Sequence, residues 1–460
     1  MQKFMPKLLK SPDLIFKYLT AAILLAIPLY PKFPFIRIPG VQVSIRLEDF
    51  LLVFLTLILA IYLLPKLKQI LSHKIERAIL LYLAVGLVSL LSGVFLTKTV
   101  IPQVGFLHWA RRIEYFVPFF LGIVAIKRRQ NLEFYLKVIM LTLFVILIYG
   151  LGQRYFSWPI IITQNVEYSK GVALRWIQGS HVNSTFAGHY DLATFLVLIL
   201  PTLICLIAML KNFKTKIVLS ALVFGGLWLL AAAVSRISIV SYLLSTSLAL
   251  ILLKKYKVLV VALAVSIVFF SFSSDLAARY RSVIDVFIKG IGQHNLLPNP
   301  SSFEVFAQEE VLGQKTRQTP TPTPLPVFED RSSSIRLNVE WPRALRALAK
   351  NPLLGTGYSS ITLATDNDYL RALGEVGILG FSALALIFVR IGKVIVSKVR
   401  KLKELDGIQA AFVAGITGSL AGVLVNALFI DVFEASKFAI IFWLLMGILI
   451  GILTKRKYVE

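Results

Sequence analysis

The sequence predicts an all-α protein: a polytopic transmembrane helix bundle of about twelve spans. Hydrophobic residues make up 57% of the 460 residues and the mean hydropathy is +0.77, which is too apolar for a soluble globular chain. Apolar runs of about 17 to 25 residues recur along the chain, the length that a helix needs to cross the hydrocarbon core of a bilayer. Short basic segments separate every second pair of runs, as expected for cytoplasmic loops.

The basic residues give a formal net charge of +25 at pH 7, a value that nucleic-acid-binding proteins can also reach. Here they gather in loops between apolar runs, so membrane topology explains the charge and we expect no nucleic-acid partner. The single cysteine, Cys205, lies inside an apolar run. It excludes an intrachain disulfide and the usual cysteine metal motifs, and we expect neither a metal nor a cofactor.

The order of apolar runs and basic segments predicts the topology. Lysines precede the first run and no small-residue cleavage site follows it, so we interpret this run as a retained helix. Counting the runs as spans puts every lysine-rich loop on one side, which predicts a cytoplasmic-membrane protein with both termini in the cytoplasm. The predicted spans cover residues 14–30, 49–64, 78–95, 115–126, 134–151, 192–210, 217–234, 237–253, 258–272, 370–391, 410–430 and 435–453.

These spans divide the chain into three parts. Residues 1–272 carry spans one to nine, residues 273–369 form a large extracytoplasmic loop, and residues 370–460 carry spans ten to twelve. Within the loop, the Pro/Thr repeat at 319–326 predicts a flexible tether with nothing to pack against. An amphipathic helix is expected at about 340–350.

The amphipathic helix follows from a helical spacing of apolar residues. Trp341, Leu345 and Leu348 fall at i, i+4 and i+7 and share one face. Pro352 ends the helix, since the residue before a proline is driven out of the α region. Residues 365–368 then offer a cap for the next helix. The pattern predicts a lid packed on the outer mouth of the bundle.

Arginines are unexpectedly frequent on the outer side, where the charge rule predicts few basic residues. A guanidinium group can bind two phosphate oxygens at once and stays charged at any working pH. Each of them can instead reach lipid headgroups, but Arg236 separates two apolar runs near membrane depth, where ionisable groups suggest function. The outer arginines are Arg46, Arg111, Arg112, Arg175, Arg236, Arg336 and Arg343, with Arg111 and Arg112 in a loop before the span at 115–126.

Histidines and acids form two further candidate groups. His181, His189 and Asp191 precede the span at 192–210, with too few converging ligands for a metal site. A general base fits them, and so does an ordinary polar cluster at a helix entry. Asp366 lies ahead of the span at 370–391, where the helix dipole favours acids and where it could also accept a proton from a hydroxyl group.

Four fragments of the chain resemble the O-antigen ligase and O-antigen polymerase superfamily. Asp366 stands where that family usually has histidine, and Asn367 matches the asparagine that follows it. Arg336 matches the second outer arginine of the family, and Arg175 is the nearest candidate for the first. The fragments, within residues 175–381, are NSTFAGHYDLATFLVLILP, VSRIS, IRLNVEWPRALRALAKNPLLGTGYSS and DNDYLRALGEVGILGF.

The resemblance implies a metal-independent membrane glycosyltransferase that moves a glycan from a polyprenyl-diphosphate carrier to an acceptor hydroxyl at the outer face of the cytoplasmic membrane. Its expected partners are the lipid-linked glycan donor, a glycan or lipid-glycan acceptor, and membrane lipids. The implied site has catalytic residues Asp366, His189 and Asn367, diphosphate-binding residues Arg175, Arg236, Arg336 and Arg343, and acceptor or lid residues Trp341, Tyr358 and Tyr369.

A transporter or flippase of lipid-linked glycans is the alternative. Such proteins are commonly built from internal repeats. No repeat is visible in this sequence, and the large outer loop divides the chain after span nine rather than at its middle. A surface scaffold without catalysis also stays open, because the family histidine is replaced. The sequence leaves ligase and polymerase equally open.

Overall fold

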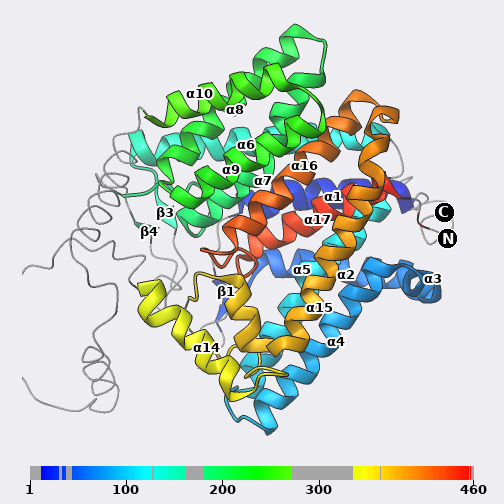
Figure 1. Ribbon diagram of the computed structural model, residues 1–460, viewed down its shortest axis with the longest axis vertical. Coiled ribbons are helices and arrows are strands. Elements are labelled where there is room, and N and C mark those ends of the chain that lie inside the picture. Colours follow the sequence, from blue (N-terminus) through cyan, green and yellow to red (C-terminus); the bar gives the residue numbers. More distant parts are fainter. Residues whose placement is uncertain are drawn as a thin grey trace, which may run out of the picture.

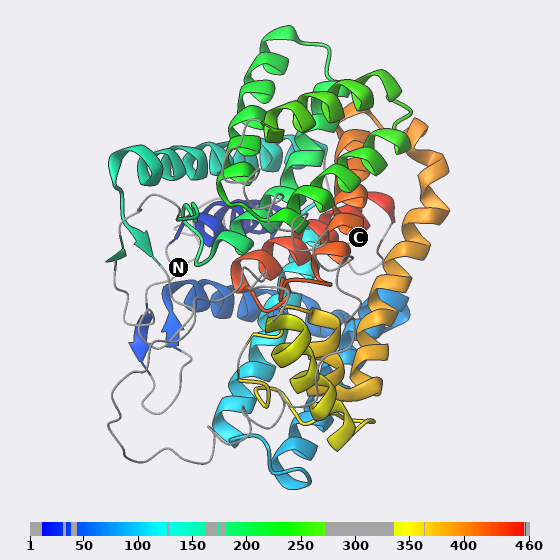
Figure 2. The same ribbon diagram turned by 60° about the vertical axis from the view of Figure 1, so that its left-hand side comes forward.

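The computed structural model describes residues 12–30, 34–37, 44–126, 129–161, 173–174, 180–271, 335–362, 364–454 and 456. Over these residues the chain forms a helical bundle with two short antiparallel hairpins, β1–β2 and β3–β4 (Figures 1 and 2). The predicted tether at 319–326 lies outside the described residues.

In chain order the elements are α1 (Pro12–Leu29), β1 (Pro34–Arg37), β2 (Ser44–Arg46), α2 (Leu47–Leu63), η2 (Leu64–Lys66), α3 (Leu67–Ser72), α4 (Lys74–Phe95), α5 (Pro102–Ala125), α6 (Arg129–Phe156), β3 (Ile160–Ile161), β4 (Ala173–Leu174), α7 (His189–Met209), α8 (Phe213–Ala232), α9 (Arg236–Leu252), α10 (Tyr256–Ser271), η4 (Arg336–Glu340), α14 (Trp341–Lys350), α15 (Asp368–Val399), η5 (Arg400–Glu404), α16 (Gly407–Asn426) and α17 (Ser436–Leu453).

The all-α prediction is confirmed, and each predicted span overlaps one of these helices. Among the described residues, eight helices are long and apolar enough to cross a membrane, while α9 and α10 are apolar but shorter. The chain is therefore a multi-pass membrane protein. The total of about twelve spans stays a prediction.

Helices α7 and α17 form the centre of the bundle. In each, 83% of the apolar stretch is buried inside the protein, compared with 22% for the segment Glu48–Ser72. Helix α17 crosses α5 so closely that a Cβ at Gly122 or Gly447 would meet the backbone of the other helix. Small residues at such crossings let backbones approach, which gives helices in lipid their packing energy.

The loop predicted at residues 108–114 is wrong, because these residues are part of α5. The helix begins at Pro102, where proline is well tolerated in the first turn. Arg112 is only 7% exposed and forms an ion pair with Glu434, in the turn between α16 and α17. The distant carboxylate neutralises a charge that the local sequence leaves uncompensated, so the helix extends through it.

Helix α15 is broken at Gly377, whose φ is +65°, a region that glycine adopts readily. The segment 352–357 lies across the break. Thr356 N and Gly357 N donate to the carbonyls of Gly374 and Glu375, and the amides of residues 378 and 379 donate to the carbonyls of residues 352 and 353. The chain after α14 thus satisfies backbone groups that the broken helix leaves open.

The bundle has two distinct ends, and α4 runs from one to the other. At its start, Glu76 pairs with Arg456, just beyond α17. At its end, Ser89 Oγ lies 2.9 Å from the Glu375 carbonyl oxygen and Thr99 donates to the Thr356 carbonyl. We call this second end the α14 end; helix α14 lies there beside α15 (yellow and orange, Figures 1 and 2). It corresponds to the predicted outer side.

Candidate functional site

Two residues from separate predicted groups meet at the α14 end. Arg336 begins the single π-helical turn η4, directly before α14, and Asp366 lies in the turn before α15. The Nε and Nη2 atoms of Arg336 donate to Asp366 Oδ2 at 2.9 and 2.7 Å. Their side chains are 13% and 24% exposed. With Glu340 and Arg343 they form what we call the open cluster.

The surroundings keep the Arg336 guanidinium charged and bring the pKa of the Glu340 carboxyl group close to neutral pH. Burial alone would lower the pKa of Arg336, but the Asp366 carboxylate and the Tyr190 phenol raise it above its ordinary value. Burial raises the pKa of Asp366, against the pull of Arg336. Burial and the nearby Asp366 carboxylate raise the pKa of Glu340 to about 7. A carboxyl group with that pKa can both take up and release a proton near neutral pH.

Several polar atoms of this region are enclosed and have no hydrogen-bond partner among the described residues. They are Oε2 of Glu340, Nε1 of Trp341, Nη1 of Arg343 and Oγ1 of Thr365. Enclosed polar groups are nearly always paired, and leaving one unpaired costs about 1–3 kcal/mol. These four atoms on η4, α14 and the 365–367 turn offer hydrogen bonds to a polar ligand, although enclosed atoms of the same kind occur elsewhere in the described residues, as at Arg112 Nε and Glu375 Oε1.

The N-terminal turns of three helices, α7, α9 and α15, lie around the end of α16, where Asn426 and Ala427 bind them. Asn426 Nδ2 donates to Thr194 of α7 at 3.1 Å and to Ser238 of α9 at 3.2 Å. The next residue, Ala427, accepts from the amide of Asp368, the first residue of α15. Helix N-termini carry partial positive charge and exposed amides. Their convergence makes this end of the bundle favourable for an anion.

The histidines lie at the start of α7. The rings of His181 and His189 have centroids 4.4 Å apart, and His189 lies 4.1 Å from the ring of Tyr190. Tyr190 in turn adjoins Arg336. The histidine pair is therefore next to the open cluster. Arg236 is in the first turn of α9, on the same end of the bundle, whereas Arg175 lies outside the described residues.

The remaining predicted residues divide between the open cluster and the packing around it. Trp341 packs against Phe429, with ring centroids 6.4 Å apart. Asn367 Oδ1 accepts from the amide of Leu370 and so caps α15. The Tyr369 hydroxyl donates to a carbonyl of α16, and Tyr358 is 2% exposed in a small apolar core under the 352–360 segment. Tyr358 is thus not brought to the open cluster.

A second arginine–carboxylate group lies deeper, and we call it the closed cluster: Arg112, Arg371, Glu375 and Glu434. Arg371 Nη2 lies 3.6 Å from Glu375, and its Nε lies 3.6 Å from Glu434, which also pairs with Arg112. Burial would raise the pKa of Glu434, but Arg112 and Arg371 outweigh it and lower the pKa to about 2. The charges here are balanced by one another.

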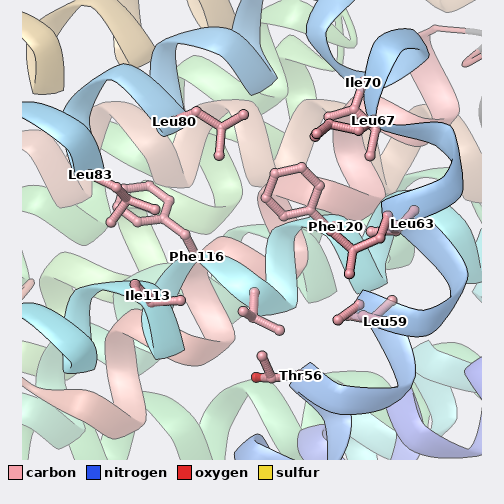
Figure 3. A pocket seen from close by; sticks show the side chains of 13 residues that line it. Thr56, Leu59, Leu63, Leu67, Ile70, Leu80, Leu83, Ile113, Phe116 and Phe120 are labelled. Carbon is pink, nitrogen blue, oxygen red and sulfur yellow. The ribbon is translucent and has the colours of Figure 1, made fainter.

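A cavity of about 330 Å³ lies between α2, α3, α4 and α5 (Figure 3). Apart from Thr56, its lining is apolar, and the Thr56 hydroxyl donates to the Leu52 carbonyl of its own helix. The labelled leucines and phenylalanines point into it. Such a lining suits hydrocarbon and offers nothing to a sugar or a phosphate, so the cavity is not the candidate site.

Sequence reasoning missed Glu340, Tyr190 and Asp431. Asp431 Oδ2 lies 3.2 Å from Arg371 Nη1, and Oδ1 and Oδ2 accept from backbone amides of the 365–367 turn. The available signals were the four-residue spacing of Arg336 and Glu340, and the acids of the short turn before the last apolar run. Over the described residues no group of three His, Cys, Asp or Glu side chains could hold a metal ion.

The fold and the open cluster define a class: multi-pass membrane proteins with a charged, partly enclosed site at one end of the bundle. Comparison with known families then makes the assignment narrower. A family model described as O-antigen ligase matches residues 221–385, from within α8 to the middle of α15. The match supports the O-antigen ligase superfamily, as the sequence fragments predicted, and implies a ligase activity of the glycosyltransferase kind. No curated protein matches the chain.

Proposed function

We propose that the protein transfers a glycan from a polyprenyl-diphosphate carrier to an acceptor hydroxyl at the open cluster. The observation that carries the proposal is the pairing of Arg336 with Asp366 at 2.7 Å, beside enclosed polar atoms that have no hydrogen-bond partner in the part of the chain that the structure describes. Arg336 is suited to bind a diphosphate, and Asp366 is suited to accept a proton from a hydroxyl group. The family match to O-antigen ligase supports the same reaction class.

The ion pair between Arg336 and Asp366 sets the order of events: the donor binds first, and proton transfer follows. A diphosphate that binds Arg336 competes with Asp366 for the guanidinium, and bidentate guanidinium–phosphate pairing is strong. Asp366 then loses the partner that lowers its pKa, while burial continues to raise it. The freed carboxylate is a better proton acceptor than it was before the donor bound. Donor binding thus prepares the base.

In the transfer step the acceptor oxygen attacks the anomeric carbon, and the bond from that carbon to the diphosphate oxygen breaks. The hydroxyl proton passes to Asp366, and the polyprenyl diphosphate leaves with the bonding electrons. Arg336 stabilises the negative charge that develops on the leaving group, helped by Arg236, Arg175 and Arg343. Fixed guanidinium groups can meet this need without a metal ion.

His189 is the alternative base. Its ring is next to Tyr190, which adjoins Arg336, so a proton could reach either residue. Trp341 Nε1, enclosed and without a partner among the described residues, is suited to bind an acceptor hydroxyl. Asn367 supports the base by fixing the start of α15, with Tyr369 beside it. Tyr358 supports the floor beneath the lid rather than touching substrate.

The proposal places the α14 end on the outer side of the cytoplasmic membrane. Lysine-rich loops then face the cytoplasm together with both chain termini, as the charge rule requires. The partners are the lipid-linked glycan donor, a glycan or lipid-glycan acceptor, and the surrounding lipids. In the same frame, residues 273–369 form the outer segment that brings η4 and α14 to the site.

The direct test compares Arg336→Ala with Arg346→Ala in proteoliposomes that contain a polyprenyl-diphosphate-linked glycan and an acceptor. Arg346 is exposed on α14 and provides a matched loss of charge. Removing one group that stabilises developing charge costs about 100- to 1,000-fold in turnover, so we expect that loss for Arg336→Ala and near wild-type transfer for Arg346→Ala. Wild-type transfer by Arg336→Ala would refute the role of Arg336.

Two further readouts separate the alternatives. Asp366→Asn should lose transfer if Asp366 is the base, whereas His189→Gln should lose it if the histidine is. Movement of the donor lipid across the bilayer with no glycan transferred would instead favour a flippase.

A further inference from the structure

Asp431 lies in the turn between α16 and α17 and holds the turn that carries Asp366. Its Oδ2 accepts from the Thr365 amide at 2.8 Å, and its Oδ1 accepts from the Asn367 amide at 3.0 Å. The Asp431 side chain is 12% exposed. One carboxylate therefore binds the main chain on both sides of Asp366.

Asp366 needs this support because its backbone is in an unfavourable conformation. Its φ is +49°, in the left-handed region that residues with a Cβ adopt only at a cost. Such conformations persist where the surroundings over-determine them. The two hydrogen bonds from Asp431 provide that constraint, and the resulting turn directs the Asp366 carboxylate at Arg336.

Asp431 is itself held in place from α15. Arg371 Nη1 donates to Asp431 Oδ2 at 3.2 Å, and Arg371 Nη2 donates to the Ile361 carbonyl at 3.1 Å. Arg371 also lies 3.6 Å from Glu375. The position of Asp431 is thus fixed by the closed cluster, and Asp431 transmits that position to the open cluster.

We propose that Asp431 is a positioning residue for glycan transfer, which fixes the 365–367 turn so that Asp366 faces Arg336 and the incoming hydroxyl. The inference rests on the proposed function. It assigns Asp431 no contact with substrate: the residue acts through Asp366. A displacement of about 1 Å at a reacting group can reduce turnover about 100-fold, so loss of this anchor should appear in kcat.

The positioning role predicts a second effect, a change in pKa values at the site, that loss of a purely structural residue would not produce. Burial is the main cause of the raised pKa of Asp366 and of Glu340, and the negative charge of Asp431 adds to it in both. Removing this charge should lower both pKa values. The acid limb of the pH–rate profile, where the base becomes protonated, should then move to lower pH.

The experiment measures kcat, KM for the donor and the pH profile of Asp431→Ala and Asp431→Asn in proteoliposomes. The alanine variant should lose about 100-fold in kcat. The asparagine variant keeps one oxygen for one of the two amides, so its kcat should lie between alanine and wild type, with the acid limb shifted. The matched control is Glu76→Gln, a buried carboxylate that pairs with Arg456 at the other end of the bundle. It should unfold at lower temperature but retain kcat per folded molecule.

Wild-type kcat in both Asp431 variants would overturn the proposal, as would an equal loss of kcat in Glu76→Gln. If Asp431→Ala does not fold, Asp431→Asn decides by the same readouts. Arg336→Ala, assayed in parallel, separates the two levels of inference. Activity in Arg336→Ala would refute the proposed function, whereas an inactive Arg336→Ala beside a fully active Asp431→Asn would refute only the role of Asp431.

Discussion

The open and closed clusters contain the same chemical groups, guanidinium and carboxylate, at the same end of the bundle, yet they differ in how those groups are satisfied. In the closed cluster, Arg371 lies between Glu375 and Glu434. In the open cluster, Arg336 pairs with Asp366, whereas Glu340 and Arg343 form no ion pair among the described residues. Within the described ranges, enclosed polar atoms without a hydrogen bond occur in both clusters, on Glu340 and Arg343 in the open one and on Arg112 and Glu375 in the closed one. The difference teaches that balanced charges hold a fold together, whereas incompletely balanced charges leave capacity for a ligand.

Breaking the closed cluster should have the largest effect on stability. Glu434→Ala leaves the Arg112 guanidinium buried without its carboxylate, and such a change costs about 3–5 kcal/mol. Thermal unfolding of the purified protein in detergent measures the loss. Glu404→Ala, which removes an exposed carboxylate, should leave the unfolding temperature nearly unchanged. An unfolding temperature equal to wild type in Glu434→Ala would mean that the pair does not stabilise the fold.

The backbone bonds that cover the closed cluster should come next in size. Gly377→Ala places a Cβ against backbone atoms of Leu353 and Gly355 and imposes a positive φ on alanine, at a cost of about 1–3 kcal/mol. Gly392→Ala in the same helix meets open space among the described residues and should stabilise it by up to about 1 kcal/mol. The same unfolding assay compares the two, and equal effects would contradict the strain at Gly377.

The pH dependence of stability should have opposite signs in the two clusters. Glu340 has a raised pKa of about 7, so its folded form binds a proton that the unfolded chain has released above pH 4.5. Its contribution to stability therefore falls as pH rises between about 4.5 and 7. Glu434, with its pKa lowered to about 2, contributes stability above pH 4.5 that is lost as pH falls.

Substitutions isolate each contribution to the pH dependence. Glu340→Gln should remove the decline toward neutral pH, and Glu434→Gln should remove part of the decline in acid, both measured as unfolding temperature against pH. These are the smallest effects, because Glu340 is partly exposed and water screens its charge. The same slope in Glu340→Gln and wild type would show that Glu340 does not titrate near 7.

Much of this architecture could be predicted because it depends on local composition. Apolar runs located most helices to within a few residues, although α5 begins 13 residues before its predicted span and α15 ends 8 residues after its own. The spacing of Trp341, Leu345 and Leu348 located α14. The matched fragments identified Arg336 and Asp366 as candidates, and both lie in the open cluster. Their ion pair joins residues 30 positions apart, which no periodicity encodes.

The misses share a physical cause: a partner far away in the sequence. Arg112 seemed to belong in a loop until Glu434, 322 positions later, neutralised it. No sequence pattern singled out Asp431, because its amide partners lie 64 and 66 positions earlier. Tyr358 looked available for a ligand, but the fold encloses it. Only tertiary packing decides whether such side chains stabilise the fold or lie at the candidate site.

The segment 352–357 is joined to α15 at the helix break by main-chain hydrogen bonds. Main-chain bonds survive most side-chain substitutions. The attachment of α14 to the bundle is thus largely insulated from the chemistry that α14 displays. The exposed residues of α14 can therefore change while the helix keeps its place beside α15.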